Sequence, residues 1–143
     1  MRVSEVMTRD AECIGPDSTL QQAAEKMKSL DVGSLPVCDN DRLAGMLTDR
    51  DITVRSVSDG QDPRTDRVRD AMTPKVIYCS EDQDIAEAAK LMKENQIRRL
   101  PVLNRDKRLV GIVSLGDLAV ETHDEQLAGS TLEAVSEPSQ PNR

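Results

Sequence analysis

Two four-residue segments pair a hydroxyl with a carboxylate at one spacing: Thr48-Asp49-Arg50-Asp51 and Ser114-Leu115-Gly116-Asp117. Each segment follows an apolar run and would begin a helix, where free N–H groups and the helix dipole favour an anion. A carboxylate there can accept hydrogen bonds from both hydroxyls of a ribose. The pattern therefore favours a site for ribose and phosphate. The alternative is a capping box, in which the same two side chains start a helix without any ligand.

Arg98 and Arg99 are the second feature with binding chemistry. They stand directly before Leu100-Pro101, at the entrance to a predicted strand. Two adjacent guanidinium groups can clamp a phosphate through bidentate hydrogen bonds. The alternative is a solvated basic patch that continues into the cations of the following hairpin. The matching place earlier in the chain holds Gly33-Ser34, which lacks cations and should bind phosphate less well.

The hydroxyl-carboxylate pattern recurs because the chain contains an internal repeat. Residues 3–52 align with residues 68–118 at an offset of 65, which becomes 66 after one extra residue in a hairpin. Apolar types are kept at matching positions, which indicates a duplicated unit of roughly 50 residues. The match is carried by Val6-Met7-Thr8 with Ala71-Met72-Thr73, Leu35-Pro36-Val37 with Leu100-Pro101-Val102, and Gly45-Met46-Leu47-Thr48 with Gly111-Ile112-Val113-Ser114.

Each repeat is predicted as strand, helix, strand, strand and helix. An apolar stripe at helical spacing over residues 20–30 predicts the first helix. Ser18 and Gln21 have the form of a capping box that begins it, and Asp84 and Glu87 have the same spacing at the start of the matching helix in the second repeat.

A hairpin and a second helix complete the repeat. Residues 35–38 and 43–47 are the predicted strands, and Asp39-Asn40-Asp41 has turn chemistry. The second helix is expected from Thr48 to about Val57. Four methionines at matching repeat positions are expected in the core: Met7, Met27, Met72 and Met92.

The predicted fold class is α/β (α+β), with the repeats packed about a pseudo-twofold axis. One repeat is too small and too poor in apolar residues to be stable alone, so two copies should share a core and leave two clefts. The predicted division is 1–57 for repeat 1, 58–67 for a linker, 68–121 for repeat 2 and 122–143 for a tail. A weak helix is expected over 124–136, followed by disorder over 137–143.

The duplicated pattern resembles the CBS domain family. Its most specific stretches are Gly45 to Ile52 and Arg98 to Val102, and the likeness covers about residues 1–120. The chain is most similar to small stand-alone bacterial CBS-pair proteins, including the mycobacterial hypoxic response type. The resemblance implies a regulatory module that binds AMP, ADP, ATP or S-adenosylmethionine, requires no cofactor and signals to a separate effector protein.

The resemblance also implies a role for each candidate residue. The basic pair of one repeat would serve the carboxylate of the other repeat, which makes the Asp51 site the better one. In this family pattern, Asp51 and Asp117 would bind ribose, and Thr48 and Ser114 would contact ribose or phosphate. Val76 and Ile77, on the first strand of repeat 2, would offer backbone groups to adenine. Arg98 and Arg99 would bind phosphate.

Composition narrows the function further. The chain has 143 residues, a net charge of −7, one Tyr and neither Phe nor Trp, so we expect no nucleic-acid partner. No apolar run approaches the roughly 20 residues needed to cross a bilayer, and no signal peptide is visible, so a cytoplasmic location without a membrane partner is expected. We find no pattern typical of catalysis or metal binding, and therefore expect no enzyme.

Two alternatives stay open from the sequence. A CBS pair without an attached effector domain can be a ligand-independent interaction module, and a homodimer formed through helix faces is expected in either case. Cys13 and Cys38 can form a disulfide if their strands adjoin, although small buried thiols are the more common state in a reducing cytosol.

Overall fold

The computed structural model describes residues 1–138 and divides into two compact units. The N unit comprises Glu12–Val76, and the C unit comprises Met1–Ala11 together with the chain from Ile77 onward. The predicted mixed α/β class is confirmed. The predicted disorder over 137–143 falls largely on residues 139–143, which lie outside the described part.

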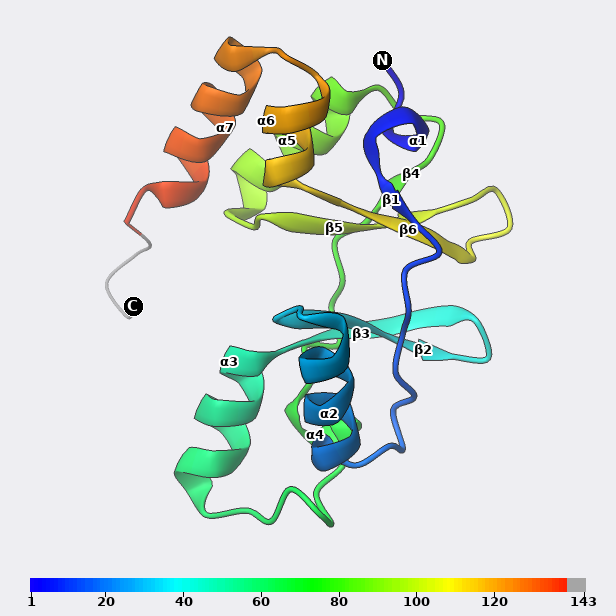
Figure 1. The fold of residues 1–143 in the computed structure, drawn as a ribbon, viewed down its shortest axis with the longest axis vertical. Coiled ribbons are helices and arrows are strands. Elements are labelled where there is room, and N and C mark those ends of the chain that lie inside the picture. Colours follow the sequence, from blue (N-terminus) through cyan, green and yellow to red (C-terminus); the bar gives the residue numbers. More distant parts are fainter. Residues whose placement is uncertain (139–143) are drawn as a thin grey trace. The chain divides into compact units, whose positions relative to one another are not determined.

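The C unit contains a four-stranded sheet in the order β1-β6-β5-β4, and its helices α5, α6 and α7 lie on one side of that sheet (Figure 1). Strands β5 and β6 form an antiparallel hairpin, β1 pairs antiparallel with β6, and β4 pairs parallel with β5. The elements are α1 (Val3–Val6), β1 (Thr8–Arg9), β4 (Cys79–Ser80), α5 (Ile85–Asn95), β5 (Arg99–Leu103), β6 (Leu109–Ser114), α6 (Leu115–Glu121) and α7 (Glu125–Ser136).

The N unit repeats this scheme on a smaller sheet. Its hairpin β2-β3 receives Ile14 as a parallel bridge to Val37 and Thr73 as an antiparallel bridge to Met46. The elements are α2 (Leu20–Leu30), β2 (Ser34–Asp39), β3 (Arg42–Thr48), α3 (Asp49–Asp51), the π-helix η1 (Ile52–Ser56), the 3₁₀ helix η2 (Val57–Asp59) and α4 (Val68–Ala71).

The opening segment of each repeat belongs to the unit that contains the rest of the other repeat. Val3 and Val6 are buried in the core of the C unit, whereas Val68 and Ala71 are buried in that of the N unit. The compact units and the sequence repeats are therefore different divisions of the chain. A short helix, α1 or α4, precedes the extended residues in each segment, which the sequence pattern did not predict.

The opening segment of a repeat passes close to the hairpin in each unit, which explains why each hairpin contains a glycine. At Gly111 a Cβ would lie 2.6 Å from the Thr8 carbonyl oxygen, and at Gly45 it would lie 2.8 Å from that of Thr73. Real Cβ atoms do not approach backbone oxygens so closely, so only glycine lets the opening segment pass. In the N unit, the Met46 and Thr73 backbones exchange two hydrogen bonds of 3.0 and 2.8 Å there.

The helix starts require a correction of one residue. Thr19, rather than Ser18, caps α2: its hydroxyl accepts from the Gln22 N–H at 3.1 Å, and the Gln22 side chain accepts from the Thr19 N–H at 2.9 Å. The predicted Ser18–Gln21 box is thus wrong in register. Asp84 caps α5 as expected, but it accepts from the Ala86 N–H and no capping box with Glu87 forms.

The hairpin turns account for the shift in repeat offset. Asn40 and Asp41 both have positive φ, 51° and 67°, as the two central residues of a tight hairpin turn require. The second hairpin has a longer loop, in which the Asn104 side chain accepts from the N–H groups of Asp106 and Arg108.

Two further predictions change in detail. The second helix of the first repeat runs through Asp59, and five of its residues have π-helical hydrogen bonding. Val76 and Ile77 have no regular secondary structure and lie before β4, so their predicted place on a strand is wrong. The methionines are in the cores as predicted, with Met72 only partly buried.

Candidate ligand-binding site

The two hydroxyl-carboxylate pairs form capping boxes of nearly identical geometry. The Thr48 N–H donates to Asp51 Oδ2 at 3.0 Å, and the Asp51 N–H donates to Thr48 Oγ1 at 3.0 Å. The Ser114 and Asp117 pair has the matching distances of 2.9 and 3.0 Å. Each box uses one oxygen of its carboxylate. A carboxylate has capacity for further acceptor bonds, so capping and ligand binding are compatible.

The second oxygen has different surroundings in the two boxes. Asp51 Oδ1 lies 4.0 Å from Arg55 Nε, and the Arg55 guanidinium also donates to the carbonyls of Ala71 and Met72 at 3.1 Å each. The position that corresponds to Arg55 in the second repeat holds Glu121. Within residues 1–138, Asp117 has no ion pair.

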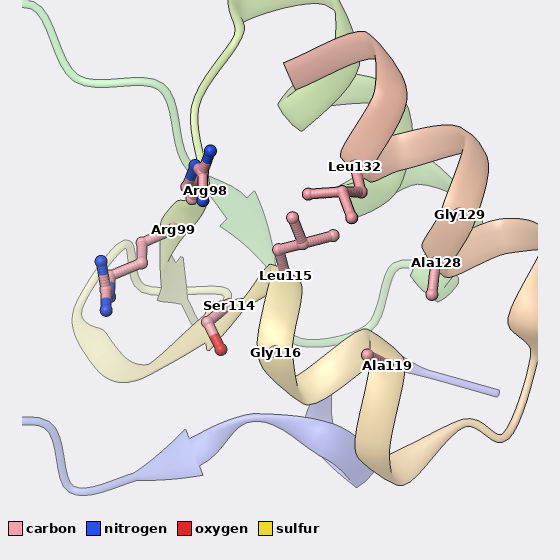
Figure 2. Close-up of a pocket in the computed structure, with 9 residues that line it drawn as sticks. All are labelled: Arg98, Arg99, Ser114, Leu115, Gly116, Ala119, Ala128, Gly129 and Leu132. Carbon is pink, nitrogen blue, oxygen red and sulfur yellow. The ribbon is translucent and has the colours of Figure 1, made fainter. Parts of the chain in front are cut away.

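A pocket of about 430 Å³ lies in the C unit, where β5, β6, α6 and α7 meet (Figure 2). It is of the size that small-molecule sites usually have. Figure 2 shows the two arginines at the start of β5 on one side and helix α7 on the other. The lining residues are Arg98, Arg99, Ser114, Leu115, Gly116, Ala119, Ala128, Gly129 and Leu132.

Strand pairing brings the arginines and the serine together. Arg99 is directly opposite Ser114 in the β5-β6 ladder, and the Leu115 N–H donates to the Arg98 carbonyl at 2.8 Å. Both arginines are exposed, and neither guanidinium has a hydrogen bond or ion pair within the described residues. Two guanidinium groups without internal partners are free to bind an anion.

The corresponding place in the N unit has the opposite charge. Ser34 is opposite Thr48, and the Asp49 N–H donates to the Gly33 carbonyl at 2.9 Å, so the backbone arrangement is the same. However, Gly33, Ser34 and Asp49 carry a charge of −1, whereas Arg98, Arg99 and Leu115 carry +2. The difference of three charges makes only the C unit attractive to an anion at this place.

The remaining predicted residues fall into both units. Thr48, Asp51 and Val76 belong to the N unit, whereas Ile77 and Asp117 belong to the C unit. Asp117 is not among the residues that line the pocket. Val76 and Ile77 are partly buried, and no hydrogen bond within the described part of the chain uses their backbone groups. These groups can therefore serve a ligand.

The sequence patterns did not single out the pocket's contribution from α7. Ala128 and Leu132 are four residues apart and so face the same way on the helix. Leu127, Thr131 and Val135 form a separate stripe with the same spacing, and Thr131 and Val135 are buried. The signal in the sequence for this side of the pocket was the apolar pair Ala128 and Leu132, which lies beside the buried stripe of the same helix.

The cysteines are reduced in this structure. Cys13 and Cys38 flank the Ile14–Val37 bridge, and the Cys38 N–H donates to the Ile14 carbonyl at 3.0 Å, so their segments adjoin as a disulfide would require. Burial, followed by the neighbouring Cys13 thiol, raises the pKa of Cys38 to about 12. Burial alone raises the pKa of Cys79 to about 12. These raised pKa values favour the protonated thiol over the thiolate at neutral pH for both groups.

Two negative findings apply to residues 1–138. No group of three or more His, Cys, Asp and Glu side chains is placed to hold a metal ion. In the same part of the chain, every helix is too short or too polar to cross a membrane.

Comparisons with known proteins agree with the repeat pattern. The family model "CBS domain" matches residues 3–57 and 68–123. The CBS domain-containing protein YhcV of Bacillus subtilis is 40% identical over 134 residues, which is 94% of each chain. Hypoxic response protein 1 of Mycobacterium tuberculosis is 40% identical over 116 residues, which is 80% of each chain.

Solved structures agree as well. The crystal structure of Hypoxic Response Protein I with two coordinated zinc ions matches with a TM-score of 0.77 and 39% identity, over 83% of this chain and 97% of that one. The structure of CBSX2 in complex with AMP matches with a TM-score of 0.75 and 27% identity, over 87% and 98%. With two family matches and relatives at 40% identity, this chain belongs to the CBS domain family.

Proposed function

We propose that this chain is a regulatory CBS pair that senses an adenosyl nucleotide, with AMP, ADP, ATP and S-adenosylmethionine as the candidate ligands. The observation that carries the proposal is the pocket in which Arg98 and Arg99, which have no side-chain partner among residues 1–138, lie beside Ser114. Charge-assisted hydrogen bonds from guanidinium groups are strong and suit phosphate geometry. The AMP bound to CBSX2 supports the choice of ligand class.

The proposed roles divide the nucleotide among the predicted residues. Arg98, Arg99 and Ser114 bind phosphate. The carboxylates of Asp51 and Asp117, each with one oxygen outside its capping box, are the proposed ribose acceptors, and Thr48 lies beside Asp51. The unbonded backbone groups of Val76 and Ile77 are the proposed contacts for adenine.

Isothermal titration calorimetry with AMP, ATP and S-adenosylmethionine tests the proposal. We expect the double variant Arg98→Ala/Arg99→Ala to lose AMP binding. The matched control is Arg105→Ala/Lys107→Ala, which removes the same charge from the hairpin of the same unit. If both double variants lose equal affinity, the arginines are only a solvated basic patch. If the wild-type chain binds none of the three compounds, the proposal fails.

The proposed signal passes to a separate effector protein in the cytoplasm. Two relatives support this, because the match covers 94% of YhcV and 80% of Hypoxic response protein 1, which leaves little of either relative for an attached effector. We propose that the chain itself performs no catalysis and needs no metal. Turnover of ATP by the purified protein, abolished by Asp51→Ala, would contradict this.

One observation favours a ligand-independent, homodimeric interaction module as a second candidate. Val54 and Val120 occupy equivalent repeat positions on the second helices and are 48% and 66% exposed. A matched pair of exposed apolar residues suits an interface between copies. Light scattering with Val54→Asp/Val120→Asp should show a dimer becoming a monomer. A wild-type monomer would contradict the homodimer.

A further inference from the structure

One end of the pocket in the C unit is apolar and has no role in the proposed binding of phosphate. Leu115 and Ala119 contribute from α6, and Ala128, Gly129 and Leu132 contribute from α7. In Figure 2 the side chains of Leu115 and Leu132 extend from these two helices on the far side of Arg98 from Arg99. We call this end of the pocket, defined by these five residues of α6 and α7, the α7 compartment.

Helix α7 is a fixed wall of this compartment. Its residues Thr131 and Val135 are buried, and the Gln96 side chain donates to the carbonyls of Ala134 and Glu137 at 3.3 and 3.0 Å. At its other end, the Asp124 side chain accepts from the Leu127 N–H at 2.9 Å. Gln96, the C-cap of α5, thus ties the last turn of α7 to another element, Asp124 caps the first turn, and Leu132 is still 48% exposed. A half-exposed leucine on the wall of a pocket is apolar surface that a ligand can cover.

Gly129 keeps the compartment open. It lies in the middle of α7, where glycine disfavours a helix relative to alanine. A Cβ at Gly129 would meet no atom within 4 Å, so neither close packing nor a positive φ calls for glycine here. This differs from Gly45 and Gly111, at which a Cβ would collide with backbone. A larger side chain at Gly129 would occupy the compartment without disturbing the fold.

From these observations we infer that the ligand is an adenylate whose phosphate carries a further uncharged, apolar group, and that the α7 compartment binds this group. The inference rests on the proposed binding of phosphate by Arg98 and Arg99. Arg98 and Arg99 line the same pocket as the compartment, and Arg98 is the nearer of the two to Leu115 and Leu132 in Figure 2, so a substituent on their phosphate can reach it. The class includes adenylate esters and mixed anhydrides, and excludes free AMP as the preferred ligand.

The test compares two probes of equal charge, the methyl ester and the phenyl ester of AMP. Calorimetry on the wild-type chain should show the phenyl ester binding about tenfold more tightly, because the ring buries apolar area that methyl does not. Gly129→Leu should remove this advantage, so that this variant binds the two esters with equal affinity. The control Ser130→Leu adds the same side chain at an exposed neighbouring position outside the pocket and should keep the advantage.

The outcomes separate the inference from the function it rests on. If the wild-type chain binds neither ester and none of AMP, ATP and S-adenosylmethionine, the proposed function fails; if it binds any of these three compounds but neither ester, only the inference fails. If it binds both esters equally, or if Gly129→Leu retains the phenyl preference, the inference fails while nucleotide binding stands. Circular dichroism melting of both leucine variants checks folding, and a folded Ser130→Leu variant that loses the phenyl preference also contradicts the proposed position of the group.

Discussion

The N unit and the C unit share a backbone plan and differ in what they place at the start of the second helix. Both have a hairpin glycine under a crossing segment, a parallel bridge and a capping box with distances of 2.9 to 3.0 Å on its two bonds. The N unit then has Gly33, Ser34 and Asp49, whereas the C unit has Arg98, Arg99 and Leu115. Duplication preserved these features of the backbone, whereas the charges at the start of the second helix diverged.

The same divergence between the units explains why helix α7 packs on the C unit. It belongs to the C unit, where Leu91, Ile97 and Leu115 are partly buried against the core. The equivalent positions of the N unit hold Lys26, Val32 and Asp49, and the Lys26 ammonium instead donates to the Cys13 carbonyl at 3.0 Å. Two of these three positions are charged in the N unit, and only Val32, which is 42% exposed, offers apolar surface to a covering helix at these positions.

The largest expected effect comes from the feature that the units share. Gly111→Val forces a side chain against the Thr8 carbonyl, which lies 2.6 Å from the Cβ position, and should destabilise the chain by about 3 kcal/mol. Gly45→Val should cost a similar amount because Thr73 lies at 2.8 Å. Urea denaturation measures both. A loss below about 1 kcal/mol in only one variant would show that the two crossings are not equivalent.

The next prediction makes the C unit resemble the N unit. Leu115→Asp places a carboxylate beside Arg98 and Arg99, as Asp49 lies beside Gly33. We expect a loss of about 2 kcal/mol in AMP binding, or roughly thirtyfold in Kd, because the carboxylate competes with phosphate for the guanidinium groups. Calorimetry measures this. Leu115→Asn is the neutral control, and an equal loss there would assign the effect to apolar contact rather than to charge.

Removing either carboxylate should lower the stability by a similar amount but the AMP affinity by different amounts. Asp51→Ala and Asp117→Ala each remove the N3 half of a capping box, for about 1 kcal/mol of unfolding free energy, and the half-exposed Arg55 adds little to the loss in Asp51→Ala. AMP affinity should fall more in Asp51→Ala, because the family resemblance pairs the basic residues of one repeat with the carboxylate of the other. Parallel denaturation and calorimetry separate the two quantities. A greater affinity loss in Asp117→Ala would assign the ribose to the repeat that contains the arginines.

The sequence predicted the structural features that depend on the local pattern of residues. The repeat, the hairpins and the caps at Thr48, Ser114 and Asp84 follow from spacing and residue type, and the structure contains them. The register of the cap at Thr19 was wrong because Ser18 and Thr19 are adjacent hydroxyl residues and two equivalent patterns overlap. Such overlaps are resolved by tertiary contacts, here the hydrogen bond from the Leu20 N–H to the Asp66 carbonyl at 2.9 Å.

The α7 side of the pocket could not be predicted in the same way. Arg98 and Arg99 were identified because two adjacent cations form a local pattern. Ala128, Gly129 and Leu132 are ordinary helix-face residues, and they become a wall only when α7 lies against α5 and α6. Such long-range contacts leave a weak signal in a single sequence, since they depend on packing rather than on spacing.

The smallest effect compares one glycine from each unit. A Cβ would meet nothing within 4 Å at Gly60 of the N unit or at Gly129 of the C unit, so alanine adds no collision at either position. Gly60 has φ of 72° at the end of η2, whereas Gly129 lies inside α7. Gly60→Ala should therefore destabilise the chain by about 1 kcal/mol, and Gly129→Ala should stabilise it by up to about 1 kcal/mol. Thermal melting of the two variants gives the signs. Opposite signs would show that backbone conformation explains Gly60 and that the glycine in α7 lowers the stability of the fold.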